Sequence, residues 1–287
     1  MKRRIQIGLE EEKRTIPITE KIMKKVKIMG VLNLTPDSFY DGDKDLLVNQ
    51  EKLSDKMMDL VGSDIIDIGC ESSRPNSEPI SEKEEIKRLS KVIDLISDDR
   101  FLSIDTYKHE VARYALCNGF RMINDIYAGK YDDRMLELAS EFNVPIVLMH
   151  MKGAPSNMQN NTFYDSIIDD ICHFFEERIS MAKDCGISDS NIILDPGIGF
   201  GKSLDDNFII VENINKFKRI GYKVLIGLSR KAFLAYKNDT PKDRLSATIT
   251  MNTLSVINGA DIIRVHDSFE AIKMRDTLMR YSSAINK

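Results

Sequence analysis

The sequence predicts an α/β fold, namely one eight-stranded parallel (β/α)8 barrel of the TIM type. Short apolar runs alternate with helical patterns eight times along the chain. The runs are almost wholly apolar, as expected for strands that are covered on both faces. The active site of such a barrel lies at the carboxyl ends of its strands. Most runs end on a charged or amide residue that we therefore expect in one shared mouth: Asn33, Glu71, Asp105, Asn124, His150, Asp195 and Arg264.

The expected strands and helices follow one another in chain order. The strands cover residues 26–32, 65–68, 101–104, 122–123, 146–149, 192–194, 224–226 and 262–263. The helices cover residues 46–61, 81–96, 110–117, 134–142, 164–185, 206–220, 244–257 and 269–281. In the first helix, Leu53, Met57 and Leu60 form a stripe of helical period opposite charged residues. An open doubly wound sheet is the alternative, but eight roughly equal units without a dinucleotide glycine fingerprint favour the barrel.

Length and composition suit a single catalytic domain over residues 26–287. Residues 1–25 are an extension for which we expect a short hairpin at the amino-terminal end of the barrel. The 287 residues are 42% apolar and 30% charged, as in a soluble protein with an ample core. A net charge of −4 and a pI near 5.7 argue against a nucleic-acid surface.

The same composition excludes a membrane span, because the chain has no run of 18 apolar residues. The basic start lacks the apolar segment of a signal peptide. Four cysteines share no metal-ligand spacing, and we expect them to be buried free thiols in a reducing cytoplasm: Cys70, Cys117, Cys172 and Cys185.

Two loops near the start of the barrel carry candidate binding residues. The segment NLTPDSF begins at Asn33 and can be an ordinary turn around its proline. Its functional interpretation is a flap in which Asn33 offers an amide oxygen to a hard cation such as Mg²⁺. The segment ESSRP at 71–75 places two hydroxyls beside a guanidinium, a combination that suits an anion. Loops of this composition are common, so neither segment is decisive by itself.

Asp105, Asn124 and Asp195 form a stronger signal. A carboxylate in an apolar barrel mouth is costly unless something pairs with it. One of the three could cap a helix. Two carboxylates and an amide directed inward suit a flat heterocycle with several N–H donors, such as the edge of a 2-amino-4-oxo pyrimidine. Asp195 also opens DPGIGFGK, in which three glycines allow close approach of the backbone to a ligand and Phe200 offers a stacking face.

Cationic donors gather after the last two strands. The segments GLSRK at 227–231 and RVHD at 264–267 supply Lys231, Arg264 and His266, where barrels of this type often bind phosphate. The alternative interpretation is salt bridging to the interior aspartates. That alternative would account for one lysine but accounts poorly for three donors.

Other histidines and the methionines carry less weight. His173 is expected on a helix surface or in packing, and His109 at the start of a helix. His150 ends a strand and is expected behind the residues that contact ligand. The methionines are expected to fill the core, although Met149 lies at a strand end where a ligand can touch it.

Eight segments together closely resemble dihydropteroate synthase. In chain order they are LNLTPDSF, ESSRP, SIDT, IND, LMHM, DPGIGFGK, GLSRK and RVHD, and they span about residues 26–267. The resemblance implies a barrel enzyme of folate synthesis that joins 4-aminobenzoate to 6-hydroxymethyl-7,8-dihydropterin diphosphate. It further implies release of diphosphate with help from Mg²⁺, sulfonamides as inhibitors, and a cytoplasmic homodimer.

The resemblance also assigns roles to individual positions. Asn33 would bind Mg²⁺. The pterin would be held by Asp105, Asn124, Asp195 and Lys231, with Met149 and Gly227 lining its slot. The diphosphate would contact Ser73, Arg264, His266 and Asn33. The aminobenzoate site would be shaped by Arg74, Pro75, Phe200, Ser229, Asp37, Ser38 and Phe39. The catalytic residues would be Lys231, Arg264, His266 and Asp105.

The chain departs mildly from the family pattern. Cys70 and Asn76 replace usual glycines, and Ser73 replaces a threonine while keeping its hydroxyl. These changes bear on the aminobenzoate pocket and on sulfonamide affinity. A corrinoid-dependent methyltransferase domain is the rival enzyme, but it would not be expected to keep both SRK and RVHD. A non-catalytic pterin-binding barrel would be expected to lose Asn33, Lys231 or His266, and all three are present.

Overall fold

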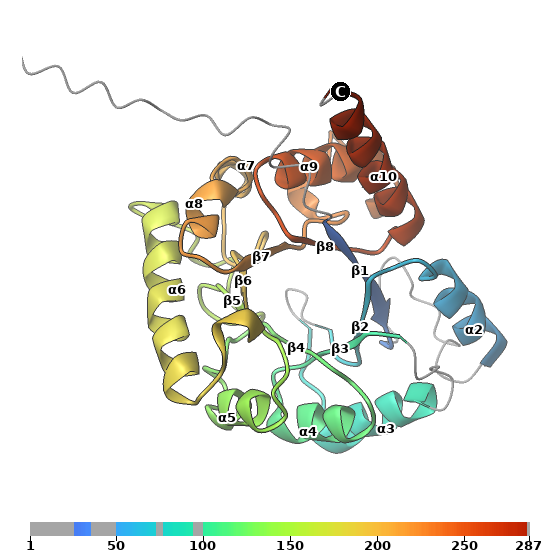
Figure 1. The fold of residues 1–287 in the computed structure, drawn as a ribbon, viewed down its shortest axis with the longest axis vertical. Helices are drawn as coiled ribbons and strands as arrows, with labels where there is room; N and C mark the ends of the chain where they lie inside the picture. The colour runs from blue at the N-terminus through green and yellow to red at the C-terminus, as the bar shows by residue number, and fades with distance from the viewer. Residues whose placement is uncertain (1–25, 36–49, 73–76, 94–99, 286–287) are drawn as a thin grey trace, which may run out of the picture.

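Eight parallel strands close in chain order into one barrel, as the sequence predicts. The computed structural model describes residues 26–35, 50–72, 77–93 and 100–285. The first strand pairs with the last and so closes the barrel (Figure 1). The strands are β1 (Lys27–Asn33), β2 (Ile65–Gly69), β3 (Leu102–Asp105), β4 (Ile123–Asp125), β5 (Ile146–Met149), β6 (Ile192–Asp195), β7 (Lys223–Ile226) and β8 (Ile262–Val265). The hairpin expected for residues 1–25 lies outside the described residues.

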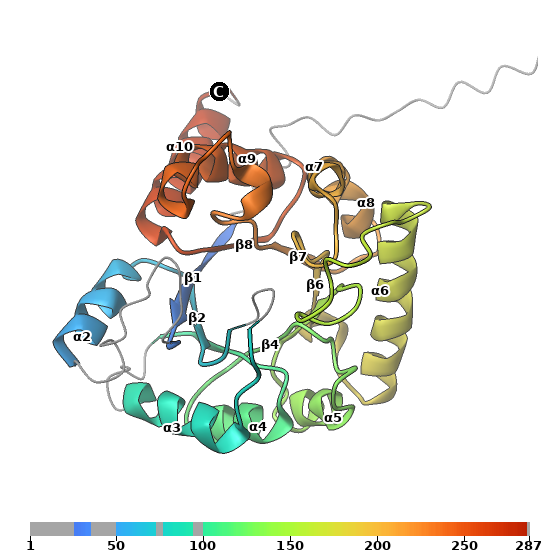
Figure 2. The same ribbon diagram turned by 180° about the vertical axis from the view of Figure 1, so that it is seen from behind.

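Helices form an outer ring around the strands (Figures 1 and 2). They are α2 (Gln50–Asp59), α3 (Glu82–Ile93), α4 (His109–Cys117), α5 (Arg134–Glu141), α6 (Ile167–Asp184), α7 (Leu204–Glu212), α8 (Ile214–Lys218), α9 (Leu245–Ile257) and α10 (Ser268–Ile285). Three short 3-10 helices cover Asp189–Asn191, Ala232–Leu234 and Pro241–Arg244. A large apolar core fills the space between the strands and this ring.

A second, smaller core lies inside the barrel and places the functional layer above it. It consists of Met29, Ile65, Met122, Val147, Ile193, Leu225 and Ile262. Residues two positions apart on a strand face the same side. Two residues after Ile65, Met122, Ile193 and Ile262 the chain carries Asp67, Asn124, Asp195 and Arg264. The barrel interior therefore changes from an apolar layer to a polar layer toward the carboxyl ends of the strands.

One expected helix is two helices. The helical pattern over residues 206–220 is interrupted at Asn213, which ends α7 and precedes α8. The Asn213 side chain donates to the carbonyl of Ile209 at 2.8 Å. An asparagine that bonds nearby backbone groups competes with the helical hydrogen-bond ladder, and the chain turns here.

The expectation of four buried thiols is wrong in part. All four cysteines are free, but only Cys70 is buried, Cys117 is exposed, and Cys172 and Cys185 are partly exposed. The two helical cysteines lie outside the buried stripe of their helices. In the described part of the chain, no helix combines the length and the apolar character that crossing a bilayer requires.

Candidate active site

The polar layer at the mouth is organised around the guanidinium of Arg264. Its Nε donates to Asp67 Oδ2 at 2.6 Å, and its Nη2 donates to Asp105 Oδ2 at 2.5 Å. Asn124 Nδ2 donates to the same Asp67 oxygen at 2.9 Å. Asp67 is fully buried, and a buried carboxylate is tolerated when a cation and hydrogen bonds satisfy it. Strands β2, β3, β4 and β8 are thus joined across the barrel.

The position of Arg264 matches the alternative interpretation given above, salt bridging to interior aspartates. Burial raises the pKa of Asp105, and the Arg264 guanidinium opposes that shift. Burial disfavours the charge on Arg264, but Asp67 and Asp105 outweigh it and raise the pKa of the guanidinium. Arg264 therefore stays charged and keeps a fixed direction at the mouth.

Asp195 lies at the end of β6 and is 6% exposed. Its Oδ1 accepts from the backbone N–H of Gly197 at 2.7 Å. Burial raises the pKa of Asp195, and that hydrogen bond together with Lys231, Lys202 and Arg264 opposes the rise. The carboxylate is thus surrounded by cations without a direct salt bridge to any of them among the described residues.

Lys231 lies over the glycine-rich loop that follows Asp195. Its ammonium group donates to the carbonyl of Ile198 and lies 4.5 Å from the centroid of the Phe200 ring. Burial lowers the pKa of Lys231 to about 8, against the opposing charge of Asp195. The expected convergence of Asp105, Asp195 and Lys231 is consistent with this arrangement, because both carboxylates act on the Lys231 ammonium electrostatically.

Close packing explains the glycines of this loop. A Cβ on Gly197 would lie 2.0 Å from the carbonyl oxygen of His150, and the residue has a φ of +68°. A Cβ on Gly201 would lie 2.6 Å from the carbonyl oxygen of Lys152 at a φ of +65°. Only glycine fits both the space and the backbone conformation. The loop is therefore pressed onto the end of β5.

Lys202 holds the same two segments together and was missed in the sequence. Its Nζ lies 3.1 Å from His150 Nδ1, 3.2 Å from the His150 carbonyl and 3.0 Å from the Phe200 carbonyl. Burial lowers the pKa of Lys202 to about 7 and that of His150 to about 2. His150 is therefore a neutral acceptor behind the mouth, in agreement with its expected place.

Ser229 and His266 lie on neighbouring loops after β7 and β8. The Ser229 hydroxyl lies 3.2 Å from His266 Nδ1 and accepts from the His266 backbone N–H at 3.3 Å. Next to them, a buried Arg230 binds Asp267 through Nε at 2.7 Å and Nη2 at 2.6 Å. The two loops are thus fixed to one another by an ion pair beside the site.

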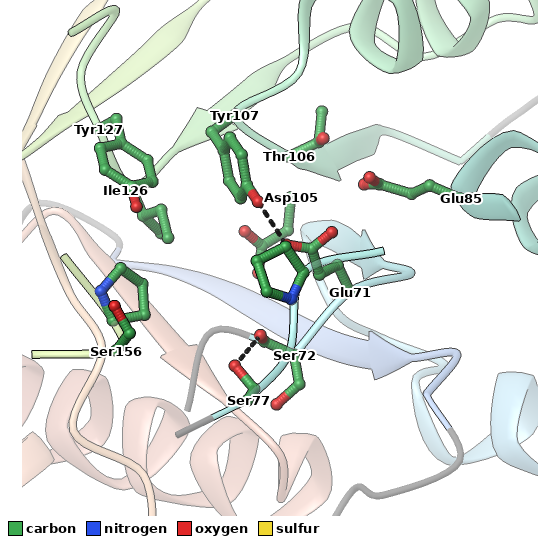
Figure 3. A pocket seen from close by; sticks show the side chains of 12 residues that line it. Glu71, Ser72, Ser77, Glu85, Asp105, Thr106, Tyr107, Ile126, Tyr127 and Ser156 are labelled. Atoms are coloured by element: carbon green, nitrogen blue, oxygen red, sulfur yellow. Dashed lines mark hydrogen bonds between the residues drawn. The ribbon is translucent and has the colours of Figure 1, made fainter. Parts of the chain in front are cut away.

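Glu71 does not join the polar layer that its place at a strand end suggested. It binds the ammonium group of Lys108 and accepts from the Tyr107 hydroxyl at 2.5 Å. A cavity of about 60 Å³ lies beside it, with Asp105 in its lining (Figure 3). Glu71 therefore forms a second polar cluster next to the first.

The oxygens around Gly69 test whether Mg²⁺ fits the site. A Cβ on Gly69 would lie 3.5 Å from Asn33 Oδ1 and 3.4 Å from Asp105 Oδ2, and the latter oxygen already accepts from Arg264 Nη2. Mg²⁺ is usually held by one or two such oxygens together with substrate phosphates. Of these two oxygens, Asn33 Oδ1 is the one that would fit an Mg²⁺ site of this kind. No cluster of three or more His, Cys, Asp or Glu side chains suitable for a metal occurs in the described ranges.

Some predicted residues lie outside the described residues, namely Asp37, Ser38, Phe39, Ser73, Arg74, Pro75 and Asn76. Of the others, Met149 is 4% exposed. Gly227 packs against the aliphatic part of the Arg264 side chain, since a Cβ on Gly227 would lie 3.7 Å from Arg264 Cβ. Sequence patterns alone do not identify Asp67, Lys108 and Lys202. The available signal for Asp67 was a carboxylate inside the otherwise apolar run IIDIG.

Comparison with known proteins gives consistent results. The sequence model of a family described as pterin binding enzyme matches residues 29–266. A dihydropteroate synthase from Clostridium beijerinckii is 42% identical over 270 residues, covering 90% of this chain and 96% of that protein. The structure of Yersinia pestis dihydropteroate synthase with a sulfonamide drug complex has a TM-score of 0.85 at 34% identity, covering 90% of this chain and 95% of that one. For Xanthomonas albilineans dihydropteroate synthase with 4-aminobenzoic acid the TM-score is 0.78 at 32% identity, and the coverages are 91% and 94%.

Proposed function

The chain belongs to the pterin-binding enzyme family, in its dihydropteroate synthase branch, and from that premise we propose how its residues carry out the reaction. The activity is that of a transferase that joins a pterinylmethyl group to an arylamine. The substrates are 6-hydroxymethyl-7,8-dihydropterin diphosphate and 4-aminobenzoate, and the products are 7,8-dihydropteroate and diphosphate. The roles of single residues below are our proposal.

The polar layer is the observation that carries the assignment of the pterin site. Asp105, Asn124 and Asp195 present acceptors at the carboxyl ends of β3, β4 and β6, above an apolar floor. A pterin edge has adjacent N–H donors that match these acceptors, and Lys231 supplies a donor to the pterin carbonyl. Asp67 has no direct role in this scheme and instead fixes Arg264 and Asn124 in position.

Arg264 and His266 bind the departing diphosphate. In the described structure Arg264 uses two of its N–H groups for Asp67 and Asp105. A guanidinium has five N–H donors, so Arg264 can hold both carboxylates and still donate to a phosphate oxygen. Donors fixed in advance stabilise developing negative charge without reorganisation during the reaction.

Asn33 would hold Mg²⁺ through its amide oxygen, with the remaining ligands coming from the diphosphate and water. When bound, the metal ion neutralises charge on the leaving group. The place of Asn33 at the carboxyl end of β1, with its amide oxygen near Gly69, supports this position. Omission of Mg²⁺ is therefore expected to lower the rate of diphosphate release.

Phe200 and Ser229 contribute to the aminobenzoate site, together with Arg74, Pro75 and the 37–39 segment, whereas Ser73 contributes to the diphosphate site. Phe200 is positioned by the glycine loop and lies under the Lys231 ammonium group. The aromatic amine is uncharged at pH 7, so no strong base is required. A sulfonamide that mimics the aminobenzoate would compete at this place.

The proposed reaction breaks one C–O bond and forms one C–N bond, and it needs no reactant besides the two substrates. The C–O bond between the pterin methylene and the diphosphate breaks, and its electron pair leaves with the diphosphate. The amine nitrogen then forms the new C–N bond and releases one proton to diphosphate or solvent. The carboxylates of Asp105 and Asp195 stabilise the electron-poor ring, and exclusion of water protects the methylene cation from hydrolysis.

One assay tests this proposal. The purified chain is supplied with the dihydropterin diphosphate, with and without 4-aminobenzoate and Mg²⁺, and both diphosphate and dihydropteroate are measured. We expect dihydropteroate only when all components are present. Diphosphate release that does not depend on 4-aminobenzoate, without dihydropteroate, would count against the assignment.

We further propose a cytoplasmic homodimer. Four free thiols suit a reducing compartment. Several large apolar side chains on α7 and α9 are exposed and offer a surface for a second copy, namely Leu204, Phe208, Ile209 and Leu254. Light scattering of the purified chain tests the oligomeric state.

A further inference from the structure

A buried ammonium group outside the pterin site joins three separate parts of the chain. Lys108 follows β3 and is 5% exposed at its side chain. Its Nζ donates to the Glu71 carboxylate, to Glu85 Oε2 at 2.8 Å and to the Ile80 carbonyl at 2.7 Å. An ammonium group has three N–H donors. Each donor therefore has one acceptor, and the direction of the group is fully determined.

The acceptors of Lys108 lie on both sides of the segment 73–76. Glu71 comes just before that segment and Ile80 just after it. Two more hydrogen bonds join the same flanks: the Ile80 N–H donates to Glu71 Oε2 at 3.2 Å, and the Ser77 hydroxyl donates to the Ser72 carbonyl at 2.6 Å (Figure 3). We call these flanks, residues 71–72 and 77–80, the stems. Lys108 adds a third link, since it binds both stems from the turn that follows β3.

The other oxygen of Glu71 is held from the same turn. The Tyr107 hydroxyl donates to Glu71 Oε1 at 2.5 Å (Figure 3). The Tyr107 ring packs edge-on against Tyr127, with centroids 5.0 Å apart, so its own position is fixed by the loop after β4. Tyr107 and Lys108 directly follow Asp105-Thr106 in the chain. The stems are therefore tied to the strand end that carries the pterin carboxylate.

Lys108, Glu71 and Glu85 form a buried cluster of charges, so the loss of Lys108 leaves both carboxylates without their cation. Glu85 is 1% exposed and Glu71 is 10% exposed at their side chains. Burial opposes the charge on Lys108, but its hydrogen bonds to both glutamates raise its pKa, and burial raises the pKa of Glu85. A buried ion pair is often no more stable than apolar packing, although removing one partner is costly. The ion pairs of Lys108 therefore contribute mainly by holding residues 71–72 and 77–80 in a fixed position.

We propose that Lys108 is a positioning residue for the synthase reaction, because it fixes the stems of the 73–76 segment relative to Asp105. The inference rests on the proposed function, in which Ser73 and Arg74 contact the diphosphate and aminobenzoate. It concerns the described stems. A shift of the stems would change the cavity beside Asp105, which Glu71, Ser72 and Ser77 help to line, while leaving Asn124, Asp195 and Lys231 unaffected.

The test compares two ligands in the variant Lys108→Met. Binding of 6-hydroxymethylpterin, measured by calorimetry, should stay within about two-fold because its partners lie in the polar layer. The KM for 4-aminobenzoate should rise on the order of 10-fold to 100-fold, since misplacement by about 1 Å can cost that much. Glu85→Gln, made with Lys108 intact, keeps an acceptor for its ammonium group, and its KM should stay within about three-fold of the wild type.

Arg275→Met is the matched control. Arg275 is 7% exposed and binds Asp64 Oδ2 at 2.7 Å at the opposite end of the barrel. Both variants lose the cation of a largely buried pair, so both should melt at lower temperature. Only Lys108→Met should change the KM for 4-aminobenzoate.

Each outcome decides the proposal. An unchanged KM in folded Lys108→Met, or an equal loss of pterin binding, overturns it. If that variant does not fold, Lys108→Gln replaces it, because glutamine keeps an N–H donor but loses the charge, and about a three-fold rise in the same KM is expected; no rise overturns the proposal. Absence of turnover in the wild type contradicts the proposed function itself, whereas normal wild-type turnover with an unaltered variant contradicts only the role of Lys108.

Discussion

Two buried lysines on different sides of the barrel mouth respond to burial in opposite ways. Lys108, after β3, and Lys202, after β6, each have three acceptors. The pKa of Lys108 is raised because two acceptors are carboxylates that outweigh burial. The pKa of Lys202 falls to about 7 because burial is opposed only by more distant carboxylates. The charge of the acceptors thus contributes, together with burial, to the opposite directions of the two shifts.

The β2–β4 side and the β5–β7 side of the barrel mouth differ in the same way as these two lysines. The β2–β4 side carries Asp67, Glu71 and Asp105, and its cations are bound tightly in ion pairs. The β5–β7 side carries Lys202 and Lys231, both of which hold their protons weakly. The first side is suited to fixing geometry, and on the second side Lys231 offers a donor to the pterin carbonyl.

The largest expected effect comes from removing Lys231, one of the two cations of the β5–β7 side. Lys231→Ala should lower kcat/KM by about 10³-fold, because a fixed donor to the pterin and a cation beside Asp195 are both lost. Circular dichroism should show an unchanged fold. Activity near that of the wild type would show that the lysine side has no part in the reaction.

Asp195→Asn removes the one buried carboxylate of that side. A hydrogen bond to a charged group contributes about 2–3 kcal/mol, so pterin binding measured by calorimetry should weaken roughly 100-fold. The substitution keeps shape and the acceptor for the Gly197 N–H. Equal pterin affinity in both proteins would exclude Asp195 from the pterin contacts.

The pH profile distinguishes the two sides in the intact enzyme. Because the pKa of Lys231 is about 8, its charge is present below that pH and is lost above it. The kcat/KM of the free enzyme should therefore fall about tenfold per pH unit above pH 8. In Lys231→Arg the decline should move beyond pH 10, since arginine keeps its proton. An identical decline in both proteins would assign it to another group.

The smallest effect concerns stability and isolates Lys202. Its pKa is about 7 in the folded protein, against an ordinary value of 10.5. Between these values the unfolded chain binds more protons, so the wild type gains unfolding free energy as pH rises, by up to about 1.4 kcal/mol per pH unit. Lys202→Met should lack this gain in urea titrations from pH 7 to pH 10. Lys108, whose pKa is raised, adds no slope in this window.

The fold and part of the site follow from local sequence. Each predicted strand overlaps an observed one, because short apolar runs between helices have few alternatives. Asp105, Asn124, Asp195 and Arg264 could be placed in one mouth because strand ends converge in a barrel. The roles given to residues 37–39 and 73–75 stay predictions.

The missed residues share a physical reason. Asp67 is meaningful only beside Arg264, which lies 197 positions away in the chain. Lys108 and Lys202 resemble solvated charges in loops until tertiary contacts bury them. The break at Asn213 depends on one side-chain hydrogen bond that periodicity does not reveal.

The bridge from Arg264 to Asp67 also has a consequence for the order of assembly. Arg264 is on β8, the strand that completes the ring by pairing with β1. A chain that ends before β8 has neither the closed barrel nor the cation that pairs with Asp67, and in the closed barrel an unpaired buried charge would cost about 3–5 kcal/mol. The catalytic mouth is therefore finished late in synthesis, when the closing strand brings in the positive charge that the early strands require.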